Sequence, residues 1–300
     1  MSYSTSLDFS ILQNQLTEGE FTTDPQELGR CSGDKWHAVH QPDAVALPHN
    51  EESVCKILRF ANTHKIPVTP RGAGYGYVGG CVPVRGGIVL SVERMNQVLE
   101  IHKTDFVARI QPGVNTKVFQ EMVEKENLFY PPDPASRADC SLGGNIATNA
   151  GGPRCLKYGV TRDYVLGLSV VLASGELVKL GSRTHKNKTG FDLHRLFVGS
   201  EGLLGIVTEA TLKLLPLPQD RACLSVGFND SRAATDAITT IFEAGILPCA
   251  LEIADEFTIA AAQKRTGSEK LRDCRAHLIV ELDGAKSSVQ SEIAELEEKL

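Results

Sequence analysis

The chain has 300 residues, of which 42% are apolar and 23% are charged, and its formal net charge is −6. This apolar content can fill the cores of two ordinary domains, which excludes a disordered or fibrous protein. Acidic residues outnumber basic ones, 37 to 31, so the chain lacks the basic stripe that would bind the phosphates of a nucleic acid. We therefore expect no nucleic-acid partner and favour small molecules or proteins as ligands.

The start of the chain and the cysteines bear on the cellular compartment. The first ten residues contain no Lys or Arg and no continuous apolar run, unlike secretory signals and transit peptides. No apolar run approaches the roughly 20 residues that a membrane span needs, so we expect no transmembrane segment. The eight cysteines form no C-x-x-C pair, and we interpret them as reduced thiols. We expect a cytoplasmic protein, with peripheral membrane attachment open only through partners.

The first half of the chain predicts an α+β domain over residues 38–218, preceded by an N-terminal extension over residues 1–37. A strand over 43–47, a helix capped by Asn50 and a strand over 66–69 indicate a β-α-β unit. A second helix is expected from Asn115 or Thr116 to about Lys125. Further short strands are expected over 87–92, 97–102, 107–111, 165–172, 176–180 and 205–215.

After Gln219 the pattern changes and indicates a second domain over residues 219–300. Strands and helices alternate there with ferredoxin-like lengths. The strands are expected over 222–228, 248–253 and 275–282, and the helices over 231–244, 256–263 and a charged segment reaching Leu300. No strand follows the last helix, so we expect this domain to be incomplete.

Glycine is distributed unevenly, with seven of the 27 residues between Gly72 and Gly87 and five between Gly143 and Gly159. Glycine is used where the backbone takes positive φ or where a ligand approaches it closely. Successive amides in such a loop can form a nest for phosphate oxygens, and Arg71 adds positive charge. The simplest alternative is a tight turn without a ligand, which does not need five glycines between Gly72 and Gly80. Two glycine-dense segments therefore predict one bound ligand.

Two other nucleotide-binding loops fit the first cluster poorly. Gly72-Ala-Gly74-Tyr-Gly76 misses the G-x-G-x-x-G spacing, and no Gly-Lys-Ser/Thr follows it. The residues after the loop also predict strands where a nicotinamide or triphosphate site needs a helix. The loop is therefore interpreted as a cradle for a long dinucleotide that is bound by loops.

Four motifs occur in order along the chain. They are 70–80, Pro132-Asp133-Pro134, the segment 140–159 with Gly143-Gly144 and Lys157-Tyr158-Gly159, and the segment 199–211. Together they resemble the FAD-linked oxidase family with a PCMH-type (vanillyl-alcohol-oxidase-like) FAD-binding domain. Within it they are most similar to the branch of the glycolate oxidase D subunit and the D-lactate dehydrogenases. The resemblance is dense over about 40–218 and weaker over 250–253 and 277–283.

The resemblance implies an α+β fold with a PCMH-type FAD-binding domain of two subdomains, followed by an incomplete ferredoxin-like substrate (cap) domain. It implies that the FAD diphosphate lies against Pro70, Arg71, Gly72, Ala73, Gly74, Tyr75, Gly76, Gly79 and Gly80. It places near the isoalloxazine ring Asp133, Pro134 and Tyr158. Along the flavin and its ribityl chain it places Ser141, Leu142, Gly143, Gly144, Asn149, Gly151 and Gly152.

The same resemblance implies that the backbone of Ile206 and Val207 meets the polar edge of the flavin or the adenine side, braced by Glu201. Ordinary loop hydrogen bonding is the alternative role of Asn149, Tyr158 and Glu201. Relatives that tether the flavin through histidine carry it about where Tyr75 stands. No histidine occurs between His64 and His102, so we expect non-covalent FAD.

The implied function is an FAD-dependent oxidoreductase acting on CH–OH donors. It would oxidise a D-2-hydroxy acid of the glycolate or D-lactate type by hydride transfer to flavin N5. The electrons would pass to a quinone or a partner, such as an iron–sulfur subunit. Two alternatives stay open: a non-catalytic FAD-binding subunit of a larger oxidase, and an oxidase of another alcohol or lactone.

The chain itself assigns no catalytic residue. The resemblance implies that the base, the carboxylate-binding group and any divalent metal site of relatives lie in the distal part of the substrate domain. Only His277 follows residue 200, and one histidine does not make such a site. We therefore expect no metal ligand in these residues and any such metal beyond residue 300.

Overall fold

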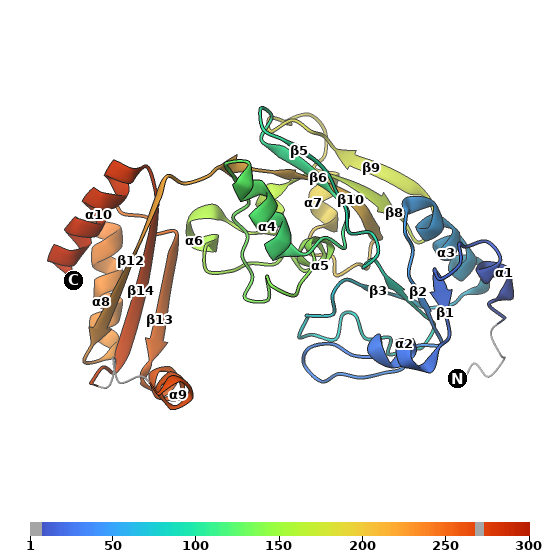
Figure 1. Cartoon of the computed structure of the whole chain (residues 1–300), viewed down its shortest axis with the longest axis horizontal. Coiled ribbons are helices and arrows are strands. Elements are labelled where there is room, and N and C mark those ends of the chain that lie inside the picture. The colour runs from blue at the N-terminus through green and yellow to red at the C-terminus, as the bar shows by residue number, and fades with distance from the viewer. Residues whose placement is uncertain (1–7, 268–272) are drawn as a thin grey trace. The chain divides into compact units, whose positions relative to one another are not determined.

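The computed structural model describes residues 8–267 and 273–300 and divides into two units (Figure 1). Unit 1 comprises the described residues up to Tyr130 together with Ala135–Ala150 and Thr161–Leu215. Unit 2 comprises Pro131–Pro134, Gly151–Val160 and the described part of Pro216–Leu300. The chain enters this last part at Pro216, near the boundary expected after residue 218. Two short segments expected within the first domain, 131–134 and 151–160, pack instead with unit 2.

The first sheet of unit 1 has the strand order β1-β2-β4-β3. Its strands are β1 (Phe21–Thr22), β2 (Ala44–Ala46), β3 (Val68–Arg71) and β4 (Ile88–Ser91). Strands β2, β4 and β3 are parallel, which confirms the expected β-α-β unit. Its helix α3 (Glu51–His64) begins at Asn50, whose side chain accepts a hydrogen bond from the backbone N–H of Ser53.

Strand β3 begins two residues later than the sequence predicts. Lys65 takes a left-handed conformation at the end of α3, and the N–H of Ile66 donates to the carbonyl of Ala61 over 2.9 Å. Ile66 therefore completes the helix end and is not available for strand pairing.

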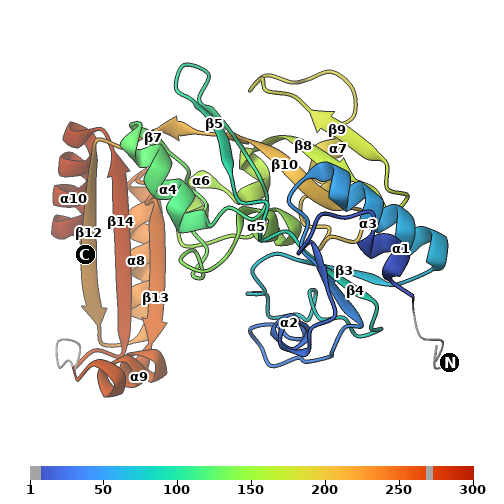
Figure 2. The same ribbon diagram turned by 45° about the vertical axis from the view of Figure 1, so that its right-hand side comes forward.

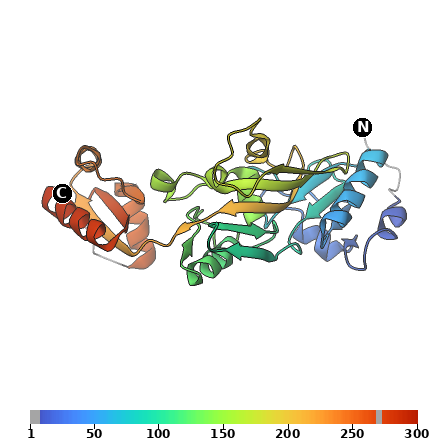
Figure 3. The same cartoon turned by 90° about the horizontal axis from the view of Figure 1, so that it is seen from above.

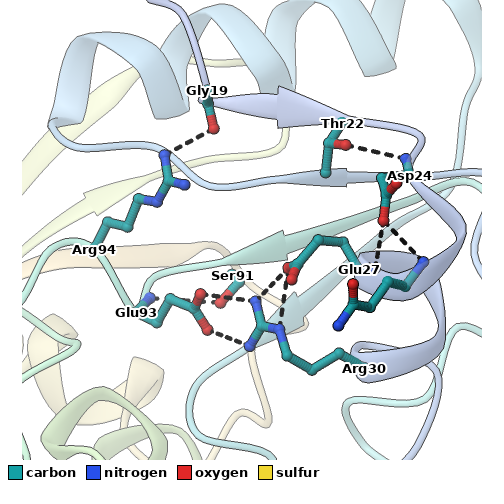
Figure 4. Close-up of polar contacts among 9 residues, drawn as sticks. Gly19, Thr22, Asp24, Glu27, Arg30, Ser91, Glu93 and Arg94 are labelled. Atoms are coloured by element: carbon teal, nitrogen blue, oxygen red, sulfur yellow. Dashed lines mark hydrogen bonds and ion pairs between the residues drawn. The ribbon is translucent and has the colours of Figure 1, made fainter.

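The residues expected as an N-terminal extension contribute to this sheet. Strand β1 pairs antiparallel with β2, and Leu12 of helix α1 (Ser10–Gln13) is fully buried in the core beside α3. A further helix, α2 (Pro25–Arg30), occupies part of the segment expected as turns. Asp24 caps α2, and Arg30 at its end pairs with Glu27 and with Glu93 beyond β4 (Figure 4).

The second sheet of unit 1 is antiparallel, with the order β5-β6-β10-β8-β9 (Figure 2). Its strands are β5 (Val98–His102), β6 (Val107–Ile110), β8 (Val165–Val171), β9 (Leu177–Gly181) and β10 (Ile206–Lys213). The expected hairpin of β8 and β9 is confirmed. The helical segments of this region are α4 (Thr116–Lys125), α5 (Leu142–Thr148), α7 (Leu193–Phe197) and a 3-10 turn over Thr161–Tyr164. Short strands β7 (Leu128–Phe129) and β11 (Leu215–Pro216) lie where the chain passes between the units.

Unit 2 is built on an antiparallel sheet with the order β12-β14-β13. Its elements are β12 (Asp220–Phe228), β13 (Ala250–Asp255), β14 (Ala276–Gly284), α6 (Cys155–Tyr158), α8 (Ser231–Glu243), α9 (Glu256–Thr266) and α10 (Lys286–Lys299). Helices α8 and α10 cover one face of the sheet (Figure 3). The core there includes Ile241 of α8, Leu296 of α10 and Leu278 of β14. The predicted alternation of strands and helices is confirmed.

Candidate functional site

The first glycine-rich loop, residues 72–80, follows β3 at the carboxyl end of the parallel strands. Gly72 lies against the start of α5, because a Cβ placed there would come 2.7 Å from Ser141 Oγ and 3.3 Å from the backbone nitrogen of Gly144. Gly76 has no neighbouring atom within 4 Å of its Cβ position, so the middle of the loop is open to a ligand. The loop therefore has a packed wall on α5 and an open backbone surface, which fits a diphosphate lying along it.

The second glycine cluster begins a helix, where loop structure was expected. Ser141 caps α5 by accepting a hydrogen bond from the N–H of Gly144 at 3.3 Å. The Asn145 amide donates to Thr116 Oγ1 at 2.7 Å, and Ile146 is fully buried. These tertiary contacts outweigh the low helix propensity of the two glycines. Asn149 ends the helix in a left-handed conformation, and its side-chain oxygen accepts the N–H of Arg162.

A third segment, residues 199–207, joins these two. The N–H of Glu201 donates to Ala147 of α5 at 2.8 Å, and a Glu201 carboxylate oxygen lies 3.0 Å from the Cβ position of Gly80. Glu201 therefore contacts both α5 and the loop over residues 72–80. Its bracing of the segment around Ile206 and Val207 stays a prediction. Ile206 and Val207 pair with Val171 and Val170 of β8, just before an irregularity in the register.

Two of the expected diphosphate contacts already have partners within unit 1. The Arg71 guanidinium donates to the carbonyl of Gly33 at 2.6 Å and approaches Cys81 Sγ at 3.4 Å. The N–H of Gly79 donates to Asp34 at 2.9 Å. Burial raises the pKa of the Cys81 thiol, so this sulfur stays protonated at neutral pH. The segment around Gly33 and Asp34 thus contacts the loop, although no sequence motif pointed to it.

In unit 2, the predicted flavin residue Tyr158 and its neighbour Lys157 contact a buried carboxylate, that of Asp283. Lys157 Nζ lies 2.6 Å from Asp283 Oδ1, and the Tyr158 hydroxyl donates to Asp283 at 2.8 Å. The Asp283 side chain is only 1% exposed and points away from the face that α8 and α10 cover. Asp283 therefore fixes Tyr158 and neutralises Lys157, although it was not a candidate. In the sequence it stands out only as an acidic residue that directly follows the strand expected over 275–282.

A second predicted residue of unit 2, Asp133, contacts Gly152 and Arg154. Its carboxylate accepts the backbone N–H of Arg154 at 3.2 Å and pairs with the Arg154 guanidinium at 3.5 Å. A Cβ at Gly152 would meet the backbone carbonyl of Asp133, so Asp133 and Gly152 are in close contact. Burial, with Asp283 nearby, raises the pKa of Cys249 to about 11, which makes this thiol neutral.

The expected FAD contacts are thus divided between the units. Unit 1 holds those of the loop, α5 and residues 201–207, and unit 2 holds Asp133, Pro134, Gly151, Gly152 and Tyr158. Within residues 8–267 and 273–300, no three His, Cys, Asp or Glu side chains come together as a metal site would require. None of the helices described in these ranges has the length and apolar character of a membrane span.

Two family models match the chain. The FAD binding domain matches residues 42–181, and the C-terminal domain of FAD linked oxidases matches residues 217–300. The glycolate oxidase subunit GlcD of Bacillus subtilis is 43% identical over 256 residues, covering 85% of this chain and 54% of that protein. The D-lactate dehydrogenase of Anaerostipes hadrus is 37% identical over 261 residues, covering 85% of this chain and 55% of that protein. The chain spans about half the length of these curated relatives.

Solved structures show the same fold. Alkyldihydroxyacetonephosphate synthase superposes with a TM-score of 0.82 at 22% identity over 99% of this chain and 60% of its own. Substrate-bound p-cresol methylhydroxylase superposes with a TM-score of 0.78 at 21% identity, over 96% of this chain and 63% of its own. The α+β class and the PCMH-type fold expected from the sequence are confirmed. The two matched domains in sequence order, on this fold, show that the chain belongs to the FAD-linked oxidases and carries their FAD-binding domain.

Proposed function

We propose that the complete protein is an FAD-dependent oxidoreductase that oxidises a D-2-hydroxy acid of the glycolate or D-lactate type. The observation that carries this proposal is the 43% identity to a glycolate oxidase subunit over 256 residues. A D-lactate dehydrogenase and the D-2-hydroxyglutarate dehydrogenase of Stutzerimonas stutzeri, 40% identical over 221 residues, share the same chemical class of substrate. The common element is a hydroxyl on the carbon next to a carboxylate.

The residues of unit 1 would hold the cofactor. The open backbone of the loop around Gly76 would receive the diphosphate, with Gly72 and Ser141 fixing the loop on α5. When bound, FAD supplies a hydride acceptor for the hydroxyl-bearing carbon. In unit 2, Asp283 fixes the Tyr158 hydroxyl and compensates the Lys157 charge, so these groups are positioned before a ligand arrives.

We propose that the electrons then leave to a quinone or to a partner protein. Three relatives are named as glycolate oxidase subunits, which supports a partner that takes electrons, such as an iron–sulfur subunit.

Anaerobic titration of the complete protein tests the proposed reaction. Glycolate, D-lactate or D-2-hydroxyglutarate is expected to bleach the flavin absorbance, whereas L-lactate is not. Bound FAD that no 2-hydroxy acid bleaches would contradict the proposal and favour a non-catalytic FAD-binding subunit. Bleaching by an alcohol or a lactone alone would instead support an oxidase of that substrate class.

We also propose that FAD is bound without a covalent link. No histidine occurs between His64 and His102. The family resemblance places a tethering histidine about where Tyr75 stands. Acid precipitation of the yellow protein is expected to leave the flavin in the supernatant. Flavin that stays with the precipitated protein would show this to be wrong.

A further inference from the structure

A short N-terminal segment folds back on itself beside the first glycine-rich loop. Gly33 and Val39 form an isolated antiparallel bridge, and the N–H of Asp34 donates to Ala38 at 3.3 Å. We call residues 33–39 the strap. It belongs to unit 1 and lies outside all four sequence motifs.

The strap contacts the loop at several points. The carbonyl of Gly33 accepts a hydrogen bond from Arg71 at 2.6 Å, and the N–H of Lys35 donates to Gly76 at 3.3 Å. The Lys35 ammonium lies 5.1 Å from the centre of the Tyr75 ring. Trp36 meets Tyr77 edge to face with ring centres 5.8 Å apart. The strap therefore follows the loop from its start to Tyr77.

The Asp34 carboxylate joins the strap to the far end of the loop. One oxygen accepts the N–H of Gly79 at 2.9 Å. The other oxygen accepts the N–H of Trp36 at 2.9 Å and that of Ala38 at 3.3 Å. One carboxylate thus receives three backbone donors, and hydrogen bonds to a charged group are stronger than neutral ones. Asp34 therefore holds its own segment in shape and binds the loop with the same side chain.

We propose that Asp34 is a positioning residue that orders the glycine-rich loop before FAD binds. The proposal rests on the proposed function of that loop. A loop with five glycines in nine positions loses much conformational entropy when it is fixed. If the strap fixes it beforehand, this cost does not reduce the affinity for the cofactor. Because Asp34 already binds the Gly79 amide, the diphosphate uses the other amides of the loop.

The test compares three variants of the full chain with the parent. Asp34→Ala removes the acceptor, and Asp34→Asn keeps one oxygen but loses the charge. The matched control is Asp24→Ala, because Asp24 also accepts two backbone N–H groups, those of Gln26 and Glu27, but none of its described hydrogen bonds goes to residues 72–80. Hydrogen exchange of residues 72–80 is measured without FAD, and the dissociation constant of FAD is measured by quenching of its fluorescence.

Asp34→Ala is expected to accelerate exchange in residues 72–80 and to raise the dissociation constant of FAD roughly tenfold. For Asp34→Asn, the exchange rate and the dissociation constant should lie between those of Asp34→Ala and the parent. Asp24→Ala should match the parent in both measurements. Equal loop exchange or equal FAD affinity in the parent and both Asp34 variants would overturn the proposal. A parent protein that binds no FAD would instead overturn the proposed function itself, and the role of Asp34 with it.

Discussion

At the scale of single residues, Gly72 of the loop lies directly against the start of α5. In Gly72→Ala, the new Cβ would meet Ser141 Oγ at 2.7 Å and backbone atoms of Gly144 at 3.3 Å. The hydroxyl can rotate, but the helix backbone must shift. We expect a lower free energy of unfolding, by about 1–3 kcal/mol as for other overpacked sites, and weaker FAD binding. Thermal unfolding without FAD and fluorescence titration with FAD check the two effects.

Gly76→Ala is the matched control in the same loop. Its Cβ would have no atom within 4 Å, so we expect the unfolding temperature without FAD to match that of the parent. The added methyl occupies the open surface of the loop, and FAD affinity should fall. If both variants kept full stability and full FAD affinity, neither the α5 contact nor the open surface would have the role assigned here.

The sequence indicated which glycines allow a close approach of the backbone, but not which residues they contact. The count of glycines marked Gly72 and Gly144, because clustered glycine costs backbone entropy and is used where the chain must approach another group closely. Asp34 and Asp283 left no comparable signal. Asp34 meets Gly79 and Asp283 meets Lys157 only through folding, across long stretches of chain. A single acidic residue carries no pattern that names a distant partner.

At the scale of elements, Glu20 joins the N-terminal segment to the start of α3. It is fully buried, and its carboxylate accepts the N–H groups of Thr17 and His49 and the hydroxyl of Ser53. Burial raises the pKa of Glu20, but these hydrogen bonds outweigh burial and hold the pKa below its ordinary value. Because the folded-state pKa is depressed, the ionised carboxylate stabilises the fold above the ordinary pKa of about 4.3. This contribution is lost as the pH falls through the lower folded-state pKa.

Glu20→Gln is therefore expected to lower the free energy of unfolding by about 1.5–3 kcal/mol at pH 7. The difference from the parent should shrink as the pH falls below about 4.3. Urea unfolding of both proteins at a series of pH values measures this difference in the free energy of unfolding. Glu52→Gln is the control, because Glu52 lies in the first turn of α3 but is exposed, and Lys56 is its only ion-pair partner among the contacts described. A pH-independent difference for Glu20→Gln would show that the charge contributes nothing.

At the starts of helices, capping residues predicted the structure better than the local composition did. Asn50 marked the start of α3, and of the two caps expected for α4, Asn115 or Thr116, the structure has Asn115. Each Asn side chain satisfies a free backbone N–H. Helix α2 was missed because its Asp24-Pro25 start is also typical of a turn, and six residues are too few to show helical periodicity. Helix α5 was missed because its two glycines favour a loop, and only contacts with distant residues make it helical.

At the scale of the whole molecule, sequence order and packing divide the chain differently. The FAD binding domain matches residues 42–181 as one stretch. In the structure, residues 151–160 within that stretch pack with the C-terminal sheet in unit 2. Within this unit, Lys157 and Tyr158 contact Asp283 of β14. Two stretches of the motif region therefore fold with the domain that follows, which no linear boundary describes.

Within unit 2, Asp283 links β14 to Lys157 and Tyr158. Asp283→Ala would leave the Lys157 charge uncompensated and the Tyr158 hydroxyl without this acceptor. Breaking such a pair costs about 3 kcal/mol, so hydrogen exchange in β14 and in residues 151–160 should accelerate together. The control Asp255→Ala removes an exposed helix cap in the same unit and should leave residues 151–160 unchanged. A double-mutant cycle of Asp283→Asn with Tyr158→Phe isolates the hydroxyl contact, and a coupling energy of about 1 kcal/mol is expected. Simple additivity in this cycle would mean that Tyr158 is held by other contacts, and that packing alone joins the motif to the sheet.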